Sequence, residues 1–241
     1  MKPLSDLEAL ILAGGLGTRI RPVLGEKPKA LAPVDGAPFI DWLLCTLRCE
    51  GLSRAILCLG HGASEVVEHV GRHPIEGLEI AVSVEPRPLG TAGALRHALD
   101  RIRGRTVLAL NGDTFLDLDW ERFVSDHVRR GAALTLACTH ADDRRTMGAV
   151  ECDEDGRIVS VSEKSPSAGP GWASAGTYLI ERHVIEAIPG GAVLSLERDI
   201  LPGLVGRGLH AHRGVRRVHD IGTPEGLATA QAGWRRPSST D

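Results

Sequence analysis

Glycines and basic side chains that together could bind phosphate groups lie near the N-terminus. Residues 12–18 read LAGGLGT, Arg19 follows directly, and Lys27 and Lys29 come a short distance later. Glycines let backbone amides approach a base or a phosphate closely, an arginine can bridge phosphate oxygens, and a lysine supplies a point charge. The loop therefore predicts a site for a phosphorylated nucleotide.

This loop does not fit the two common glycine motifs of nucleotide-binding proteins. A dinucleotide fingerprint that begins at Gly15 needs glycine or alanine at position 20, where Ile20 stands, and a P-loop needs Gly-Lys followed by Ser or Thr. The first difference argues against an NAD-dependent oxidoreductase, which titration with a dinucleotide would test. A different class of phosphate-binding protein is indicated.

Asp113 is the second residue with predicted chemistry. It follows the apolar segment 106–110, which has the pattern of a buried strand. Ligands of open α/β sheets gather beyond the carboxyl ends of strands, and an aspartate there suits Mg²⁺. Asp113 is therefore a candidate metal ligand at the carboxyl edge of a sheet.

Apolar segments alternate with helical patterns along the chain. Strands are predicted at 8–12, 54–59, 78–84, 106–110, 132–139, 148–152, 157–162 and 174–180, with two more between 209 and 219. Helices are predicted at 38–48, 64–70, 91–102, 120–130, 196–201 and 224–232. The turn DEDG makes 148–162 a hairpin, and Thr223 is the expected N-cap of the last helix. This βαβ alternation without a linker predicts a single α/β domain.

Composition excludes several classes of function. The 241 residues are 42% apolar and 24% charged, with a formal net charge of -3, which is typical of a soluble globular protein. Near-neutral charge and eight aromatic residues argue against nucleic acid as a partner.

No apolar run approaches the roughly 20 residues of a membrane span, and no signal peptide is recognisable, so we expect a cytoplasmic protein with no membrane partner. Residues 235–241 are expected to form a loose tail after a domain at 1–234.

The cysteines and histidines are expected to be structural. Five cysteines without framework spacing predict reduced thiols, and Cys45 and Cys49 share a predicted helix face as small core residues. The histidines show no zinc motif. His210 and His212 alternate along a predicted strand and are expected to be exposed, with a metal on their shared face as the alternative.

Read in order, the motifs resemble those of the sugar-1-phosphate nucleotidylyltransferases. That family has L-A-G-G-x-G-T-R-L-x-P-L and then P-K-x-L-x-P-V, and residues 12–34 follow the pattern. Further blocks in family order are VEPRPLGTAGAL (84–95), LNGDTF (110–115), VSEKS (161–165), ASAGTYLI (173–180), SLERDILP (195–202) and VHDIGTPEGL (218–227). The resemblance runs from about residue 10 to residue 231 and implies a Rossmann-like three-layer sandwich with a mostly parallel mixed sheet.

The resemblance also implies a role for individual residues. The catalytic cations are implied to be Arg19, Lys29 and Lys164. The nucleotide-binding residues are implied to be Leu12, Ala13, Gly14, Gly15, Gly17, Thr18, Glu85, Gly90 and Thr91, with Glu85 facing guanine. The sugar-binding residues are implied to be Asn111, Glu163, Ser174, Gly176 and Glu197. The Mg²⁺ ligands are implied to be Asp113 and Asp220. Two departures are Ser165, where the family has proline, and Ser174, where it has asparagine.

The reaction implied by the resemblance is Mg²⁺-dependent transfer of a nucleoside monophosphate from an NTP to a sugar 1-phosphate, with release of pyrophosphate. The blocks PLGTAGAL, LNGDTF and SLERDILP are most similar to those of heptose-1-phosphate and mannose-1-phosphate guanylyltransferases, which favours GTP and a manno-heptose 1-phosphate. The alternatives are mannose or glucose 1-phosphate with GTP, TTP or UTP, and a non-catalytic sugar-nucleotide-sensing subunit. Both a monomer and a homo-oligomer remain open.

Overall fold

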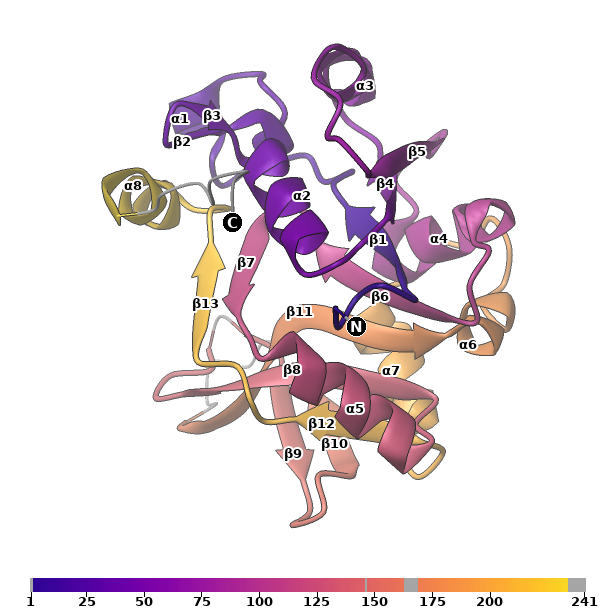
Figure 1. Cartoon of the computed structure of the whole chain (residues 1–241). Helices are drawn as coiled ribbons and strands as arrows, with labels where there is room; N and C mark the ends of the chain where they lie inside the picture. The colour runs from indigo at the N-terminus through magenta and orange to yellow at the C-terminus, as the bar shows by residue number, and fades with distance from the viewer. Residues whose placement is uncertain (1, 146, 163–168, 234–241) are drawn as a thin grey trace.

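A mixed β-sheet lies at the centre of the chain in the computed structural model, which describes residues 2–145, 147–162 and 169–233. Its strands are β1 (Glu8–Leu12), β4 (Arg54–Leu59), β5 (Glu79–Val84), β6 (Thr106–Asn111), β8 (Leu134–Ala141), β9 (Ala149–Cys152), β10 (Ile158–Ser162), β11 (Gly171–Glu181) and β12 (Leu209–His212). They follow the order β10-β9-β11-β6-β1-β4-β5, with β8 attached to β11 and β12 to β8 (Figure 1).

The four strands β6, β1, β4 and β5 are parallel neighbours. In this register Leu12 pairs with Asn111 on one side and with Cys58 on the other. Strand β11 continues the sheet in the antiparallel direction beside β6. Because the parallel strands end at one edge, the segments that follow them are brought together there.

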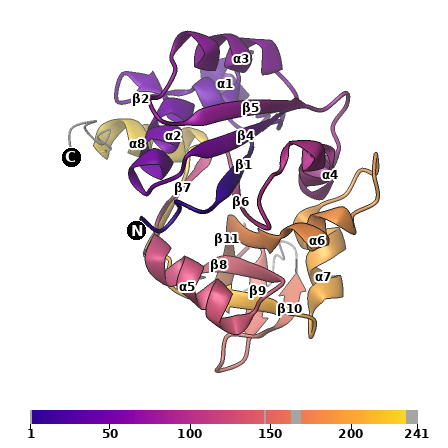
Figure 2. The ribbon, with the colours of Figure 1, turned by 45° about the vertical axis from the view of Figure 1, so that its right-hand side comes forward.

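Helices cover both faces of the sheet. On one face lie α2 (Phe39–Cys49), α3 (Ala63–Arg72), α5 (Trp120–Arg130) and α8 (Pro224–Gly233), and on the other lie α4 (Gly90–His97), α6 (Arg182–Glu186) and α7 (Leu201–Leu204) (Figure 2). Side chains of β1 alternate between the two cores: Ala9 and Ile11 join the first, and Leu10 joins the second. The predicted three-layer α/β domain is thereby confirmed.

Small elements join the layers near the edge of the sheet. A short helix α1 (Arg21–Leu24) follows the glycine loop, and β2 (Pro33–Val34) and β3 (Ala37–Pro38) form a small ribbon. Strand β7 (Thr114–Asp117) pairs with β13 (Arg217–Asp220) in a separate antiparallel ribbon. Strand β7 was not predicted, because a short strand after a turn is defined by its distant partner and not by its own pattern.

Most predicted elements agree with the structure, and the differences lie at irregular helices. The hairpin of β9 and β10 is confirmed, and the N-cap is confirmed by a hydrogen bond from Gly226 N to Thr223 Oγ1 at 3.0 Å. The predicted helix 91–102 ends at His97 and is followed by a 3₁₀ turn at Leu99–Arg101. The predicted helix 196–201 is a π-helical turn, η3 (Leu196–Ile200), that leads into α7.

Two predictions about side-chain burial were wrong. Cys49 is exposed and Cys45 is half-buried, because Cys49 is the last residue of α2, where the chain leaves the core. His210 and His212 are buried, with exposed fractions of 9% and 2%, because β12 pairs with β8 and His212 Nδ1 lies 2.9 Å from Asp126 Oδ2 of α5. None of the described helices combines the length and apolarity needed to cross a membrane. The predicted tail lies outside the described residues.

Candidate active site

A cavity of about 330 Å³ opens at the carboxyl edge of the parallel strands. Its walls come from the segments that follow β1, β5 and β6 and from the 3₁₀ turn at Lys29–Leu31. The lining residues are Leu12, Ala13, Gly14, Gly15, Leu16, Lys29, Ala30, Cys58, Glu85, Pro88, Gly90, Thr91, Ala94, Asn111, Gly112 and Asp113. Seven residues implied to bind nucleotide therefore line one cavity together with Lys29, Asn111 and Asp113.

The glycine loop owes its course to close backbone contacts. A Cβ atom at Gly14 would lie 3.0 Å from Gly60 N and 3.1 Å from Glu85 Oε1, so a side chain has no room there. Gly17 adopts a positive φ of 61°, and its carbonyl accepts a hydrogen bond from Ile20 N as the chain turns into α1. Gly17 and Thr18 are not among the residues that line the cavity.

Glu85 places a carboxylate against the glycine loop. Leu89 N donates a hydrogen bond to Glu85 Oε2 at 3.1 Å, and Oε1 faces the backbone of Gly14 and Gly60. Burial raises the pKa of the Glu85 carboxyl, against the lowering effect of the bond from Leu89. A ligand that donates N–H hydrogen bonds would stabilise a partly desolvated carboxylate of this kind.

Charged side chains from distant parts of the chain meet beside the cavity. Lys29 Nζ forms an ion pair with Asp113 Oδ2, and Arg19 lies 3.9 Å from Asp220 Oδ2. Gly222 lies between the two aspartates: a Cβ atom there would be 2.5 Å from Lys29 Nζ, 2.7 Å from Asp220 Oδ1 and 3.1 Å from Asp113 Oδ2. One ammonium and two carboxylates therefore surround Gly222, and a side chain at this position would push them apart.

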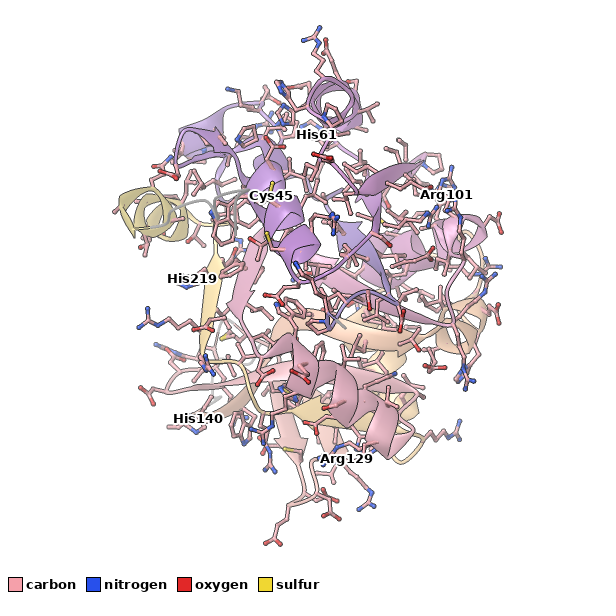
Figure 3. The ribbon with its side chains drawn as sticks, in the orientation of Figure 1. Cys45, His61, Arg101, Arg129, His140 and His219 are labelled. Carbon is pink, nitrogen blue, oxygen red and sulfur yellow. The ribbon has the colours of Figure 1, made fainter. Side chains whose placement is uncertain are left out.

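The ribbon of β7 and β13 brings the two aspartates together. Thr114 pairs with Asp220, and Ile221 N donates to Asp113 O at 3.0 Å. His219 on β13, labelled in Figure 3, stacks on Phe115 of β7 with ring centroids 6.1 Å apart. Among the described residues no three His, Cys, Asp or Glu side chains gather as a metal cage. Two carboxylates fit a hard cation such as Mg²⁺, which takes its other ligands from water and phosphate oxygens.

The residues implied to bind the sugar extend from the cavity across β11. Asn111 lines the cavity, and Gly176, with a positive φ of 70°, packs against the Asn111 side-chain amide. Gly176 N donates a hydrogen bond to Ser174 Oγ at 3.3 Å. The same Ser174 oxygen lies 3.5 Å from the Tyr178 hydroxyl. The Tyr178 hydroxyl in turn donates to Glu197.

Thr91 links this group to the nucleotide side of the cavity. Its Oγ1 accepts a hydrogen bond from Leu196 N at 2.7 Å, and Ala92 N donates to Leu194 O at 3.0 Å. The start of α4 and the turn that carries Glu197 are therefore fixed to each other. Thr91 is the second residue of α4, which begins at Gly90.

The structure also shows which residues sequence reasoning missed. Gly112, Cys58, Gly222 and Tyr178 all take part in the cavity, the charge cluster or the Glu197 contact. Gly112 directly precedes Asp113 and Gly222 lies two residues after Asp220, inside the blocks LNGDTF and VHDIGTPEGL, which is a usable signal. Cys58 is placed only by the strand register. Glu163 and Lys164 lie outside the described residues.

These features are typical of one class of protein, in which an open α/β sheet carries a site for a phosphorylated nucleotide at the carboxyl edge of its parallel strands. The family model described as nucleotidyl transferase matches residues 8–236. The chain belongs to this nucleotidyltransferase family.

Named relatives agree with this assignment. The chain is 31% identical over 230 residues to mannose-1-phosphate guanylyltransferase of Mycobacterium tuberculosis, covering 94% of this chain and 64% of the relative. It is 32% identical over 195 residues to D-glycero-alpha-D-manno-heptose 1-phosphate guanylyltransferase of Aneurinibacillus thermoaerophilus, covering 81% of this chain and 84% of the relative. The crystal structure of HddC from Yersinia pseudotuberculosis complexed with GMP-PN matches with a TM-score of 0.82 and 30% identity, covering 94% of this chain and 98% of HddC.

Proposed function

We propose that the chain transfers a nucleoside monophosphate from an NTP to a sugar 1-phosphate. The single observation that carries the proposal is the charge cluster of Lys29, Asp113 and Asp220 around Gly222, next to a cavity walled by the glycine loop. This arrangement suits a reaction in which several negative charges must be held close together. The names of the relatives point in the same direction.

The chemistry needs positioning and charge neutralisation more than proton transfer. An oxygen of the sugar phosphate attacks the α-phosphorus of the NTP, a new P–O bond forms, and the bond to the β-phosphate oxygen breaks as pyrophosphate leaves. The attacking oxygen is already an anion, so no general base is required. Arg19 and Lys29 would hold the triphosphate and the departing pyrophosphate, and Lys164 would neutralise the sugar phosphate.

Asp113 and Asp220 would hold Mg²⁺, which neutralises phosphate charge when it is bound. Lys29 fixes the Asp113 carboxylate through their ion pair. The main-chain N–H of Gly222 donates to Asp220 Oδ1 at 2.6 Å and fixes the second carboxylate. Both ligands are thus oriented by this chain's own groups.

Glu85 favours GTP as the nucleotide. Guanine presents two neighbouring N–H donors on its Watson–Crick edge, and a carboxylate offers two acceptor oxygens in a matching plane. Uracil and thymine present one N–H between two carbonyl oxygens, which would face the same carboxylate unfavourably. Two similar relatives are named as guanylyltransferases, which supports the same choice.

The sugar 1-phosphate is proposed to be a manno-heptose derivative, bound by Asn111, Ser174, Gly176, Glu197 and Glu163. The likeness to heptose-1-phosphate guanylyltransferase, of which the chain covers 84%, supports this choice. Mannose 1-phosphate is the second candidate, because the relative from Mycobacterium tuberculosis carries that name.

Pyrophosphate release across a grid of nucleotides and sugars tests the proposal. The purified chain is assayed with Mg²⁺ and each of GTP, ATP, CTP, UTP and TTP, against manno-heptose, mannose and glucose 1-phosphates, with a chelator as the control. We expect one dominant signal, with GTP and the manno-heptose, that the chelator abolishes. A signal with UTP or TTP and glucose would keep the reaction and contradict the specificity. An empty grid with measurable nucleotide binding would contradict the reaction and favour a sensing subunit.

A further inference from the structure

Glu197 is held by a buried tyrosine that belongs to a different element. Tyr178 on β11 is the single tyrosine of the chain, has an exposed fraction of 1%, and donates its hydroxyl to Glu197 Oε1. The Glu197 side chain itself is half-buried, so it has solvent or ligand on one side and Tyr178 on the other. A buried hydroxyl that donates to a carboxylate fixes where that carboxylate points.

The backbone beside Glu197 is fixed from the opposite side. Leu196 N donates to Thr91 Oγ1 at 2.7 Å, and Leu194 N donates to Leu89 O at 2.9 Å. Glu197 lies in the π-helical turn η3, and such turns are uncommon and occur frequently at functional sites. The main chain is thus anchored to α4 and the side chain to β11.

We propose that Tyr178 is a positioning residue that holds the Glu197 carboxylate in the orientation in which it accepts hydrogen bonds from sugar hydroxyls. The proposal rests on the proposed function, because it takes Glu197 as a sugar ligand. A glutamate that rotates freely loses side-chain entropy when a ligand orders it, and a side chain ordered in advance avoids most of that loss. Tyr178 therefore acts on sugar affinity through Glu197.

The protonation state of Tyr178 suits this role. Burial and the neighbouring Glu197 charge raise the pKa of the Tyr178 hydroxyl well above its usual range. The hydroxyl consequently keeps its proton, and with it the ability to donate to Glu197, at pH values above the usual range of a tyrosine. Ser174 Oγ lies 3.5 Å from the same hydroxyl.

The first test is a double-mutant cycle of Tyr178→Phe and Glu197→Gln, assayed with the best substrates of the wild-type grid. Each single variant is expected to raise the KM for the sugar 1-phosphate about tenfold and to leave the KM for the nucleotide within about twofold. Because Tyr178 acts through Glu197, the double variant should match the Glu197→Gln variant. Additive effects, or equal changes in both KM values, would overturn the proposal.

The second test is spectroscopic and does not depend on activity. Since Tyr178 is the only tyrosine, the near-ultraviolet absorbance of tyrosinate during an alkaline titration reports on this hydroxyl alone. In the folded Glu197→Gln variant the ionisation should move to lower pH, whereas Glu186→Gln, a surface change on α6, should leave it in place. An unchanged titration would show that the two groups are not coupled and would overturn the proposal.

The two tests separate this inference from the proposed function. A wild-type chain that is inactive across the grid contradicts the proposed function and, with it, the role given to Glu197. An active wild type with an additive cycle contradicts only the role of Tyr178. Thermal unfolding of each variant shows whether a loss of activity reflects a loss of folded protein.

Discussion

Lys29 shows at the scale of one residue how this chain uses its few lysines. The protein has 28 basic residues, of which only four are lysines, and one of these is paired with Asp113 beside the cavity. Their side chains are 19% and 21% exposed, so the pair is partly shielded from water and is more than a solvated surface contact. An ammonium held in this way is ready to meet phosphate oxygens without a large change in its surroundings.

Replacement of Lys29 should affect turnover far more than folding. We expect Lys29→Ala to lower kcat by about 10²–10³, because a fixed positive charge at the reacting phosphates is lost. The free energy of unfolding should change by roughly 1 kcal/mol or less, measured by urea titration. Lys2→Ala, at an exposed site near the N-terminus where the lysine contacts Cys49 O, is the matched control and should keep full activity. Activity of Lys29→Ala within a few-fold of wild type would contradict the assignment.

At the scale of elements, the contact between α4 and the segment 191–196 holds the two sides of the site together. Gly90, at a positive φ of 73°, lies so close to this segment that a Cβ atom would be 2.5 Å from Leu194 O. A Cβ atom at Gly93 would likewise be 2.6 Å from Ala192 O. The helix α4 therefore contacts the segment 191–196 through main-chain atoms, and a side chain at Gly90 or Gly93 would force them apart.

Gly90→Ala, with Gly206→Ala as its control, tests this contact. Gly206 has nearly the same φ, 74°, and among the described residues no atom lies within 4 Å of the position of its Cβ. Its variant therefore carries the backbone strain alone, about 1–2 kcal/mol of unfolding free energy. Gly90→Ala should lose roughly 1–3 kcal/mol more, because Leu194 must move. The Gly90→Ala variant should also bind the sugar 1-phosphate less tightly, since Glu197 directly follows this segment. Equal losses in the two variants, measured by urea unfolding, would refute this account.

For the whole molecule, buried histidines tie stability to pH. His127 is 3% exposed, with Nδ1 2.8 Å from Thr135 Oγ1 and Nε2 3.4 Å from Glu181 Oε1. Burial lowers the pKa of His127 more than Glu181 raises it, and burial lowers the pKa of His212 more than Asp126 raises it. Both side chains therefore stay neutral in the folded state at a pH where the unfolded chain takes up protons.

The direction of the pH effect follows from these lowered pKa values. The stability that neutral histidines contribute is fully present above the unfolded pKa of about 6.5 and is lost as the pH falls below it. We expect the free energy of unfolding to fall between about pH 7 and pH 5, with each histidine adding up to roughly 1.4 kcal/mol per pH unit. Urea unfolding at several pH values would measure this slope. A His127→Gln, His212→Gln variant that folds and keeps the wild-type slope would rule out the two histidines as its source.

Local patterns and motifs were enough to predict most of the strands and helices and most of the residues that line the cavity. Hydrophobic patterns predicted β4 and α5 at their observed bounds, since a strand or helix with one apolar face carries its own period. The glycine loop, Lys29, Asn111 and Asp113 were predicted from their motifs and lie in one cavity. Glycines and charges beside phosphates are demanded by the chemistry itself, so they remain visible in a bare sequence.

Contacts between residues far apart in the sequence could not be predicted from local patterns. The pairing of β7 with β13 brings Asp220 close to Asp113. The buried hydroxyl of Tyr178 on β11 donates a hydrogen bond to Glu197. The burial of His212 and the exposure of Cys49 were mispredicted for the same reason. Which face of an element is covered depends on strand order and on neighbours far away in the chain, and a local pattern holds no record of either.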